Sequence, residues 1–399
     1  MRLVFLIILL DLIGFGIMVP IFPFYVMNLG GSAGLATFMM ALYSGAVVIT
    51  TPILGRVSDY YGRKPVLMLS LLGAVAGYVL LGFAQTIWMV GLARLISGSM
   101  AGNIAAAQAY ITDVTDEKSR AGGMALIGMA FGLGFIIGPP LGAWLAGDSF
   151  EDANLFAPAM VSACLSLCAF LMTLFTLKES LSAKQRDKLK AQPRMSRLQA
   201  IRKTAAIPIL ITIILAALLF NIMAGLFESL FPIWGEATGI FSSPKDMLPV
   251  FLAAGFTMVI VQGGLVRPLS KRFSDFTLLK AGFLGCAIFL ALLIWFASKG
   301  NYAAFIIAMA GQAASTALVL TFLQSLVSKR APDTERGGVM GVYSSAGMAG
   351  RTFGTVATGS IMDRTFIHAP YILAIVIAIG GLVLATTTQK QSKILNLDL

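Results

Sequence analysis

The chain has 399 residues, of which 58% are hydrophobic and only 12% are charged, and its mean hydropathy is +0.87. Soluble domains carry about a quarter of their residues as Asp, Glu, Lys or Arg, so this composition excludes a soluble globular protein and predicts one that crosses a membrane several times. The net charge of +11 is compatible with a nucleic-acid partner as well as with membrane topology, and the positions of the basic residues decide between these interpretations.

Twelve apolar stretches follow one another along the chain. A membrane-spanning helix needs about 20 apolar residues, so each stretch is a candidate span. The first is too long for a cleaved signal and lacks a small-residue cleavage site, and we expect it to be retained. We therefore predict an all-α integral membrane protein with twelve transmembrane helices in two six-helix bundles. The approximate ranges of the stretches are 3–27, 33–55, 65–84, 86–109, 120–146, 155–177, 206–235, 246–268, 276–298, 301–328, 336–362 and 369–388.

The basic residues mark one side of the membrane. If the N-terminus is cytoplasmic, 24 of the 29 Lys and Arg residues fall on the inner side. This asymmetry follows the positive-inside rule. We therefore expect a multi-pass protein of the cell inner membrane with both termini cytoplasmic, and no nucleic-acid partner. The exceptions are Lys245, Lys299 and Arg364, which fall outside, and Arg94 and Arg351, which lie within predicted helices.

A basic segment divides the chain once, between the sixth and seventh predicted spans. Residues 178–203 carry nine basic and two acidic residues, which is typical of a cytoplasmic linker. An amphipathic helix against anionic headgroups is the alternative for this segment. We predict an N-terminal bundle at 1–177, a linker at 178–205 and a C-terminal bundle at 206–399.

The two halves resemble degenerate copies of each other. A shift of 216 residues aligns Gly134 with Gly350 and Gly138 with Gly354, together with four further matches. Parallel repeats of this kind place a substrate site near the midplane, between two bundles that rock against each other.

Asp11 is the only charged residue between residues 3 and 26. A carboxylate at bilayer depth costs about 3 kcal/mol on insertion scales, so such a residue usually faces a protein interior or an aqueous path. Asp11 and Arg94 each lie about eight residues, or ~12 Å, inside opposite ends of their helices, which places both near the midplane of a ~30 Å core. Because Arg keeps its proton, we predict that Asp11 carries proton coupling and that Arg94 modulates it. The alternative is a static buried ion pair that joins two helices.

The segment between the second and third spans starts at Gly55 and reads GRVSDYYGRKP. Glycine suits a tight turn, and Asp59 can accept hydrogen bonds from a helix N-terminus or a cationic neighbour. The order G-x-x-x-D-x-x-G-R-K resembles the signature loop of the major facilitator superfamily. The resemblance implies a conformational latch that packs against the start of the eleventh helix, at residues 336–338. Its residues are Gly55, Asp59, Gly62 and Arg63.

Four other segments are similar to the drug/proton antiporter branch of that superfamily, and look closest to its tetracycline-efflux-like members. They are LDLIGFGIMVP, ARLISG, YITDVTD and GLGFIIGPPLG. In this branch the Gly- and Pro-rich fifth helix is associated with antiport. Small residues at four-residue spacing also let membrane helices pack closely, and prolines interrupt the hydrogen-bond ladder of the helix. The residues of this antiporter helix are Gly134, Gly138, Pro139 and Gly142.

Some features depart from the tetracycline pumps. Residues 66–84 contain no acid, and the eighth and ninth predicted helices lack the His and Asp that such pumps use. The only histidine, His368, falls in an outer loop, and we interpret it as a surface residue. The corresponding loop in the second half has Lys271 where Asp59 would fall. The resemblance therefore implies efflux of a small molecule without implying tetracycline.

Polar residues at membrane depth outline a candidate substrate cavity. For Gln262 and Gln312 the alternative role is interhelical hydrogen bonding, and for Phe15 it is packing against other side chains. Glu228 is predicted to handle substrate or protons, the alternative being an outer-vestibule acid. The depths of Glu228 and Arg351 differ by roughly 10 Å, so a direct ion pair requires their side chains to lean together. The cavity residues are Phe15, Asn221, Gln262, Gln312 and Arg351.

We predict a proton-coupled secondary transporter that exports an amphipathic or cationic small molecule by alternating access, as in multidrug efflux and antibiotic resistance. The alternatives are a symporter of the same fold, or an exporter of an endogenous metabolite, siderophore or lipid. A membrane-embedded enzyme or a channel is less favoured, since no HExxH motif or Ser/His/Asp set lies at membrane depth. We expect a monomer in the lipid bilayer with small-molecule and proton partners, no cofactor and no metal.

Overall fold

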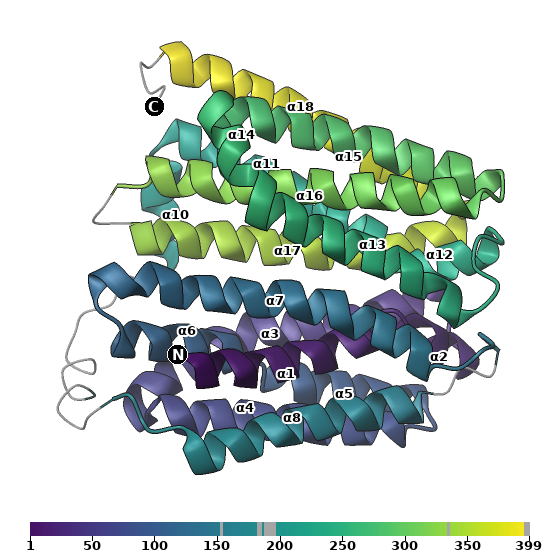
Figure 1. Cartoon of the computed structure of the whole chain (residues 1–399), viewed down its shortest axis with the longest axis horizontal. Helices are drawn as coiled ribbons and strands as arrows, with labels where there is room; N and C mark the ends of the chain where they lie inside the picture. Colours follow the sequence, from purple (N-terminus) through teal and green to yellow (C-terminus); the bar gives the residue numbers. More distant parts are fainter. Residues whose placement is uncertain (152–154, 182–185, 187–196, 333–335, 395–399) are drawn as a thin grey trace. The chain divides into compact units, whose positions relative to one another are not determined.

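The computed structural model describes residues 1–151, 155–181, 186, 197–332 and 336–394. Within those ranges it is almost entirely helical and contains no strand (Figure 1). The chain forms two compact units. The first contains Met1–Pro193 and Phe241–Leu252, and the second contains Arg194–Ile240 and Ala253–Leu399. Most of the predicted linker, at 182–185 and 187–196, lies outside the described residues, so the bundle and linker boundaries stay predictions.

The helices of the first unit follow one another with short connections. They are α1 (Arg2–Met18), α2 (Phe22–Asn28), α3 (Ala33–Tyr61), α4 (Arg63–Gly82), α5 (Ile87–Ser99), α6 (Asn103–Val114), α7 (Glu117–Leu145), α8 (Phe156–Thr176) and the short η1 (Pro244–Asp246). Helix α13 (Met247–Ile260) begins in this unit and ends in the second one.

The second unit contains the remaining helices. They are α10 (Arg197–Ala205), α11 (Pro208–Glu228), α12 (Phe231–Ala237), the π-helical turn η2 (Val261–Leu265), α14 (Val266–Arg272), α15 (Asp275–Ser298), α16 (Tyr302–Arg330), α17 (Arg336–Arg364) and α18 (Ala369–Ile394).

Nine helices of the described ranges are long and apolar enough to cross a membrane, or ten if α1 and α2, bent by 42°, form one span. Two predicted spans differ from this pattern. The fourth is broken into α5 and α6, and the eleventh, α17, is too rich in Gly, Ser and Thr to match the apolarity of the others. The prediction of an all-α membrane protein is confirmed, and the count of twelve is consistent with these helices.

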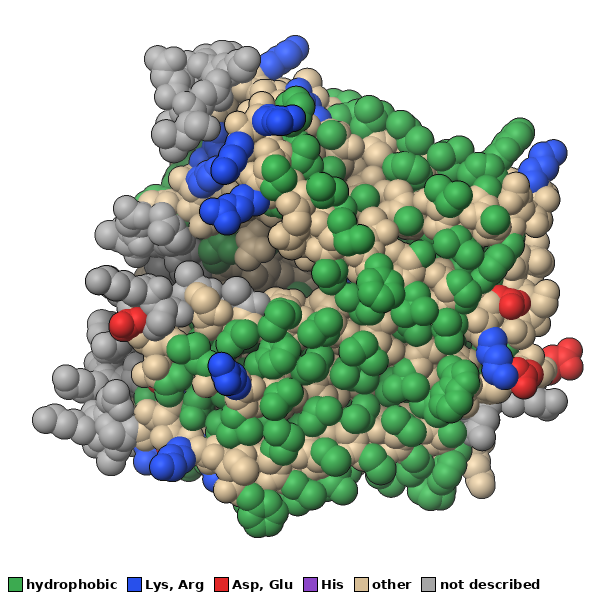
Figure 2. Space-filling view, viewed as in Figure 1, with side chains coloured by type: hydrophobic (Ala, Val, Ile, Leu, Met, Phe, Trp, Pro, Cys, Tyr) green, Lys and Arg blue, Asp and Glu red, His purple; other side chains and the backbone are tan. Residues whose placement is uncertain are grey.

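Large apolar side chains on the helix surfaces fit a lipid environment. Figure 2 shows hydrophobic side chains over most of the visible surface and charged ones gathered toward the helix ends. Trp88, Phe175 and Ile307 are 87%, 77% and 71% exposed. Because lipid tails take the place of water around such surfaces, these residues need no cover from other helices.

Glycines set the closest helix crossings in each unit. A Cβ atom on Gly138 of α7 would lie 2.7 Å from the Cα atom of Gly16 in α1. In the second unit, a Cβ atom on Gly350 of α17 would lie 2.7 Å from the carbonyl oxygen of Leu218 in α11, and one on Gly354 would meet the backbone of Ile222. The sequence repeat therefore corresponds to the same close backbone contact in both units.

His368 belongs to an aromatic cluster of the second unit. The fully buried Trp234 donates its Nε1–H to Nδ1 of His368 at 3.0 Å and stacks on Tyr371, with ring centroids 4.5 Å apart. The histidine is half-buried, so the surface interpretation holds for only part of its ring. Burial lowers the pKa of His368.

This contact predicts a pH dependence of stability. Because the folded-state pKa of His368 lies below the ordinary value of 6.5, the unfolded chain takes up a proton before the folded chain does as the pH falls. The contribution of His368 to the free energy of unfolding is thus present above the ordinary histidine pKa and is lost as the pH falls toward the lowered one.

We expect the melting temperature of the detergent-solubilised protein to fall between about pH 7 and 5 more steeply than that of His368→Gln, whose amide can still accept from Trp234 but does not titrate. His368 is the only histidine, so the difference between the two profiles isolates it. Parallel profiles would show that the contact does not select the neutral imidazole.

Candidate functional site

The first candidate site is built around a helix break. Between α5 and α6 the backbone N–H of Gly102 donates to the carbonyl oxygen of Met100 at 2.7 Å and to the Ser70 hydroxyl at 3.2 Å. Ser70 thereby satisfies a donor that the break frees from the helical ladder. The break makes Asn103 the first residue of α6. Discontinuous helices at membrane depth are typical of substrate and ion sites in transporters.

Asp11 lies against this break and is only 8% exposed. The side-chain amide of Asn103 donates to one carboxylate oxygen, and the Ser166 hydroxyl of α8 donates to the other at 3.1 Å. The Oδ1 atom of Asn103 in turn accepts from the backbone N–H of Ile104 at 2.9 Å, which fixes the amide orientation. Two neutral donors from two helices therefore hold the carboxyl group of Asp11.

Arg94 is buried, at 6% exposure, without a carboxylate partner. Its guanidinium carbon lies 4.5 Å from the centroid of the Phe22 ring and 5.9 Å from that of Tyr43. Its Nε and Nη2 atoms have no hydrogen-bond partner in the described part of the chain, and no ion pair joins Arg94 to Asp11 there. The alternative of a static Asp11–Arg94 pair is therefore not realised. The ring of Phe15 packs against that of Tyr43 in a tilted arrangement, with ring centroids 5.6 Å apart.

The signature loop forms a compact network of charges. Gly62 joins α3 to α4 with φ +113°, in the left-handed region that favours glycine. Arg63, 5% exposed, donates from Nη1 to Asp59 at 2.6 Å and to Ser58 at 2.7 Å, and from Nε to Asp113 at 3.0 Å. Two carboxylates from different helices therefore compensate one buried guanidinium.

Glu179 completes this network. Its carboxylate accepts from the backbone N–H groups of Arg63 at 2.9 Å and Lys64 at 3.1 Å, and so caps the N-terminus of α4. The predicted docking site of the loop, at residues 336–338, belongs to the second unit, and residues 333–335 just before it lie outside the described ranges. Docking therefore stays a prediction.

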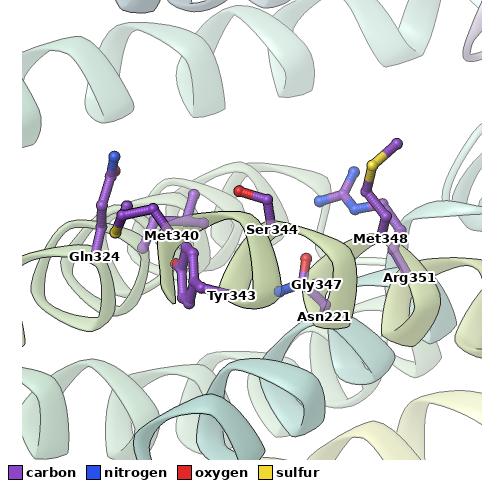
Figure 3. Close-up of a pocket in the computed structure, with 9 residues that line it drawn as sticks. Asn221, Gln324, Met340, Tyr343, Ser344, Gly347, Met348 and Arg351 are labelled. Carbon is purple, nitrogen blue, oxygen red and sulfur yellow. The ribbon is translucent and has the colours of Figure 1, made fainter. Parts of the chain in front are cut away.

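The second candidate site is a cavity of about 310 Å³ within the second unit (Figure 3). It lies between α11, α16 and α17. The volume falls at the lower end of the range for small-molecule pockets, roughly 300–1,000 Å³. The side chain of Asn221 donates to the carbonyl oxygen of Ala217 at 2.8 Å. The residues that line the cavity are Asn221, Leu320, Gln324, Met340, Tyr343, Ser344, Gly347, Met348 and Arg351.

Arg351 and Glu228 form a bidentate ion pair at this site. Nη1 of Arg351 lies 2.9 Å from Oε2 of Glu228, and Nη2 lies 3.4 Å from Oε1. Their side chains are 45% and 40% exposed, respectively, so the pair is accessible and open to competition. Figure 3 shows the guanidinium on the same side of α17 as the Ser344 hydroxyl. The side chains of Arg351 and Glu228 therefore lean together and form a direct ion pair. The difference in depth between the two positions had left this contact undecided.

Three predicted cavity residues lie elsewhere. Gln262 is exposed within the π-helical turn η2. Gln312 is 1% exposed, and its amide atoms have no hydrogen-bond partner in the described ranges. At about 100° per residue it points roughly 120° away from Gln324 on α16, which explains why it misses the cavity. Phe15 belongs to the first unit.

Comparison with known proteins identifies the family. The sequence model of the Major Facilitator Superfamily matches residues 4–332 and 268–396. The chain belongs to the major facilitator superfamily. It is 32% identical to the tetracycline resistance protein, class E, of Escherichia coli, over 85% of this chain and 82% of that protein. It is 27% identical to multidrug resistance protein 2 of Bacillus subtilis, over 96% and 92% of the two chains.

The fold agrees with that assignment. The crystal structure of a D-xylose–proton symporter superposes with a TM-score of 0.77 at 16% identity, over 97% of this chain and 96% of that chain. The family model and the relatives named for tetracycline and multidrug resistance confirm the predicted resemblance to the superfamily and to its drug-efflux members.

Sequence reasoning missed several contacts of this superfamily member. Asn103 and Ser166 are ordinary polar residues of apolar helices, and only the break after α5 distinguishes the first of them. Glu179 lies in the basic linker, far in sequence from the helix that it caps. Gln324 and Ser344 carry polar groups at membrane depth, and that signal was present in the sequence.

Proposed function

We propose that this protein is a proton-coupled antiporter that exports an amphipathic or cationic small molecule across the cell inner membrane by alternating access. The observation that carries the proposal is the buried carboxyl group of Asp11 at the helix break. Relatives named for tetracycline and multidrug resistance support drug efflux as the direction and class of transport.

The surroundings of Asp11 suit a group that gains and loses a proton. A hydroxyl such as that of Ser166 can donate to a carboxylate or accept from a protonated carboxyl, so this contact survives in both states. A direct guanidinium partner would be left unpaired whenever the acid became neutral, which is costly when buried. We assign proton binding to Asp11, electrostatic modulation to Arg94, and a contribution to proton or substrate handling to Glu228.

The remaining assignments follow from the superfamily pattern. The bundles at 1–177 and 206–399, joined by the linker at 178–205, rock around a central substrate path in a monomer with both termini cytoplasmic. In this proposal the fifth-helix residues Gly134, Gly138, Pro139 and Gly142 support antiport, and Gly55, Asp59, Gly62 and Arg63 form the cytoplasmic latch.

Inside-out membrane vesicles test the function. An exporter loads substrate into the lumen of such vesicles, and an antiporter releases lumenal protons in exchange. We expect addition of a transported drug to energised vesicles to dissipate the pH gradient, and an uncoupler to abolish drug accumulation. Accumulation that ignores the uncoupler would contradict proton coupling, and movement of drug and protons in the same direction would indicate a symporter.

The latch gives a separate prediction. Asp59→Asn removes the charge that faces Arg63 at 2.6 Å and leaves Asp113 as the carboxylate partner of Arg63 in the described part of the chain. We expect transport to fall several-fold and the inward-open population to rise, without unfolding. The measurement is the rate at which a water-soluble maleimide, added from the cytoplasmic side, labels Ser344→Cys in a background without native cysteines. Unchanged labelling and turnover would rule out the latch.

A further inference from the structure

The lining of the cavity of the second unit includes one partner of an ion pair. Its lining has one ionised side chain, Arg351, and no carboxylate among the described residues. Asn221, Gln324 and Ser344 add neutral hydrogen-bonding groups, and Met340 and Met348 add flexible apolar surface. Such a lining fits an apolar body that carries an acidic group near Arg351.

Arg351 has capacity for a ligand. A guanidinium has five N–H donors, and the described contacts of Arg351 occupy two of them, both with Glu228. The pair is 45% and 40% exposed, so water and solutes reach it. An incoming carboxylate can therefore bind Arg351 in place of Glu228 without disturbing a packed core.

The pair itself indicates the second charge of the ligand. A ligand acid that displaces Glu228 takes away the partner of that carboxylate, and a cationic group on the same ligand can replace the partner. A ligand with an acidic group and an ammonium group satisfies both residues at once. A ligand with only one of these charges pairs with one residue and leaves the other to water.

We propose that this cavity is the binding site for an amphipathic zwitterion, whose acidic group binds Arg351 and whose ammonium group binds Glu228. In the empty protein the two residues neutralise each other. That the ligand is transported rests on the proposed function, but that it binds does not. Amphipathic zwitterions are a narrower substrate class than the amphipathic or cationic small molecules expected from the sequence.

Three fluorescent probes with one apolar body test the proposal. Nε-dansyl-lysine is a zwitterion, its methyl ester is a cation, and its Nα-acetyl derivative is an anion. Binding to the purified protein in detergent is measured by dansyl emission, with no pH gradient. We expect the zwitterion to bind about ten-fold more tightly than either singly charged form, which corresponds to about 1.4 kcal/mol.

Variants separate the two contacts. Arg351→Gln is expected to abolish the preference for the zwitterion over the ester, and Glu228→Gln its preference over the acetyl form. Arg364→Gln is the matched control, because it makes the same change at an exposed position of α17 and should bind like the wild type. Thermal unfolding verifies that each variant is folded.

Equal binding of the three probes by the wild type, binding of none, or a preference that survives in Arg351→Gln would overturn the proposal. Its failure is distinct from failure of the proposed function. Zwitterion-selective binding without proton-driven accumulation in vesicles would refute antiport alone, and proton-driven drug export without this selectivity would refute the zwitterion site alone.

Discussion

Asp11→Asn protein is expected to fold and to bind substrate, but to lose accumulation driven by the pH gradient entirely. Asparagine has nearly the same shape as aspartate: its amide oxygen can accept from Asn103 and its NH2 group can donate to the Ser166 hydroxyl, but it cannot take up a proton. Because no ion pair joins Asp11 to Arg94, the substitution leaves no buried cation newly unpaired. We therefore expect little change in the melting temperature.

Two assays in the same vesicles test this prediction. Substrate counterflow needs no gradient and should persist in Asp11→Asn, whereas uptake driven by an imposed pH gradient should fall to the level of vesicles without the protein. Asp148→Asn is the matched control, since it makes the same change at a side chain that is 79% exposed. Intact gradient-driven uptake by folded Asp11→Asn protein would remove Asp11 from the coupling mechanism.

Composition and hydropathy were sufficient to predict the membrane fold and to identify Asp11, because an acid within an apolar span is conspicuous. They were insufficient to predict its partners. Depth along a helix follows from residue count, but the direction in which a side chain points depends on rotation about the axis and on breaks in the helix. The break between Ser99 and Asn103 resets that rotation, so Asn103 instead of Arg94 reaches the carboxylate.

The same limit explains the outcome in the second half. Asn221 and Arg351 line the cavity as expected, whereas Gln312, chosen for its polarity at membrane depth, points elsewhere. The Arg351–Glu228 pair could not be predicted from depth alone. The backbone positions of the two residues differ in depth, and the long side chain of Arg351 spans this difference. Contacts across large sequence separations, such as the cap that Glu179 provides for α4, have no local signal.

The glycines of α7 lead to the second prediction of large effect. Spacing alone predicts that Gly134, Gly138 and Gly142 pack closely against some helix, and the structure identifies α1 as that helix. A Cβ atom on Gly142 would overlap the carbonyl group of Ile17, which is backbone and cannot rotate away. Gly142→Ala should therefore force α1 and α7 apart, at a cost of about 1–3 kcal/mol.

Gly132→Ala is the matched control on the same helix, because a Cβ atom there meets nothing within 4 Å. Alanine is the better helix former by about 1 kcal/mol, so this variant should be as stable as the wild type or more stable. We expect the melting temperature and yield of Gly142→Ala to fall below those of Gly132→Ala. A different outcome is that both variants are equally stable and only Gly142→Ala loses proton exchange. In that case Gly142 contributes to antiport, and the close crossing of α1 and α7 does not require a glycine at this position.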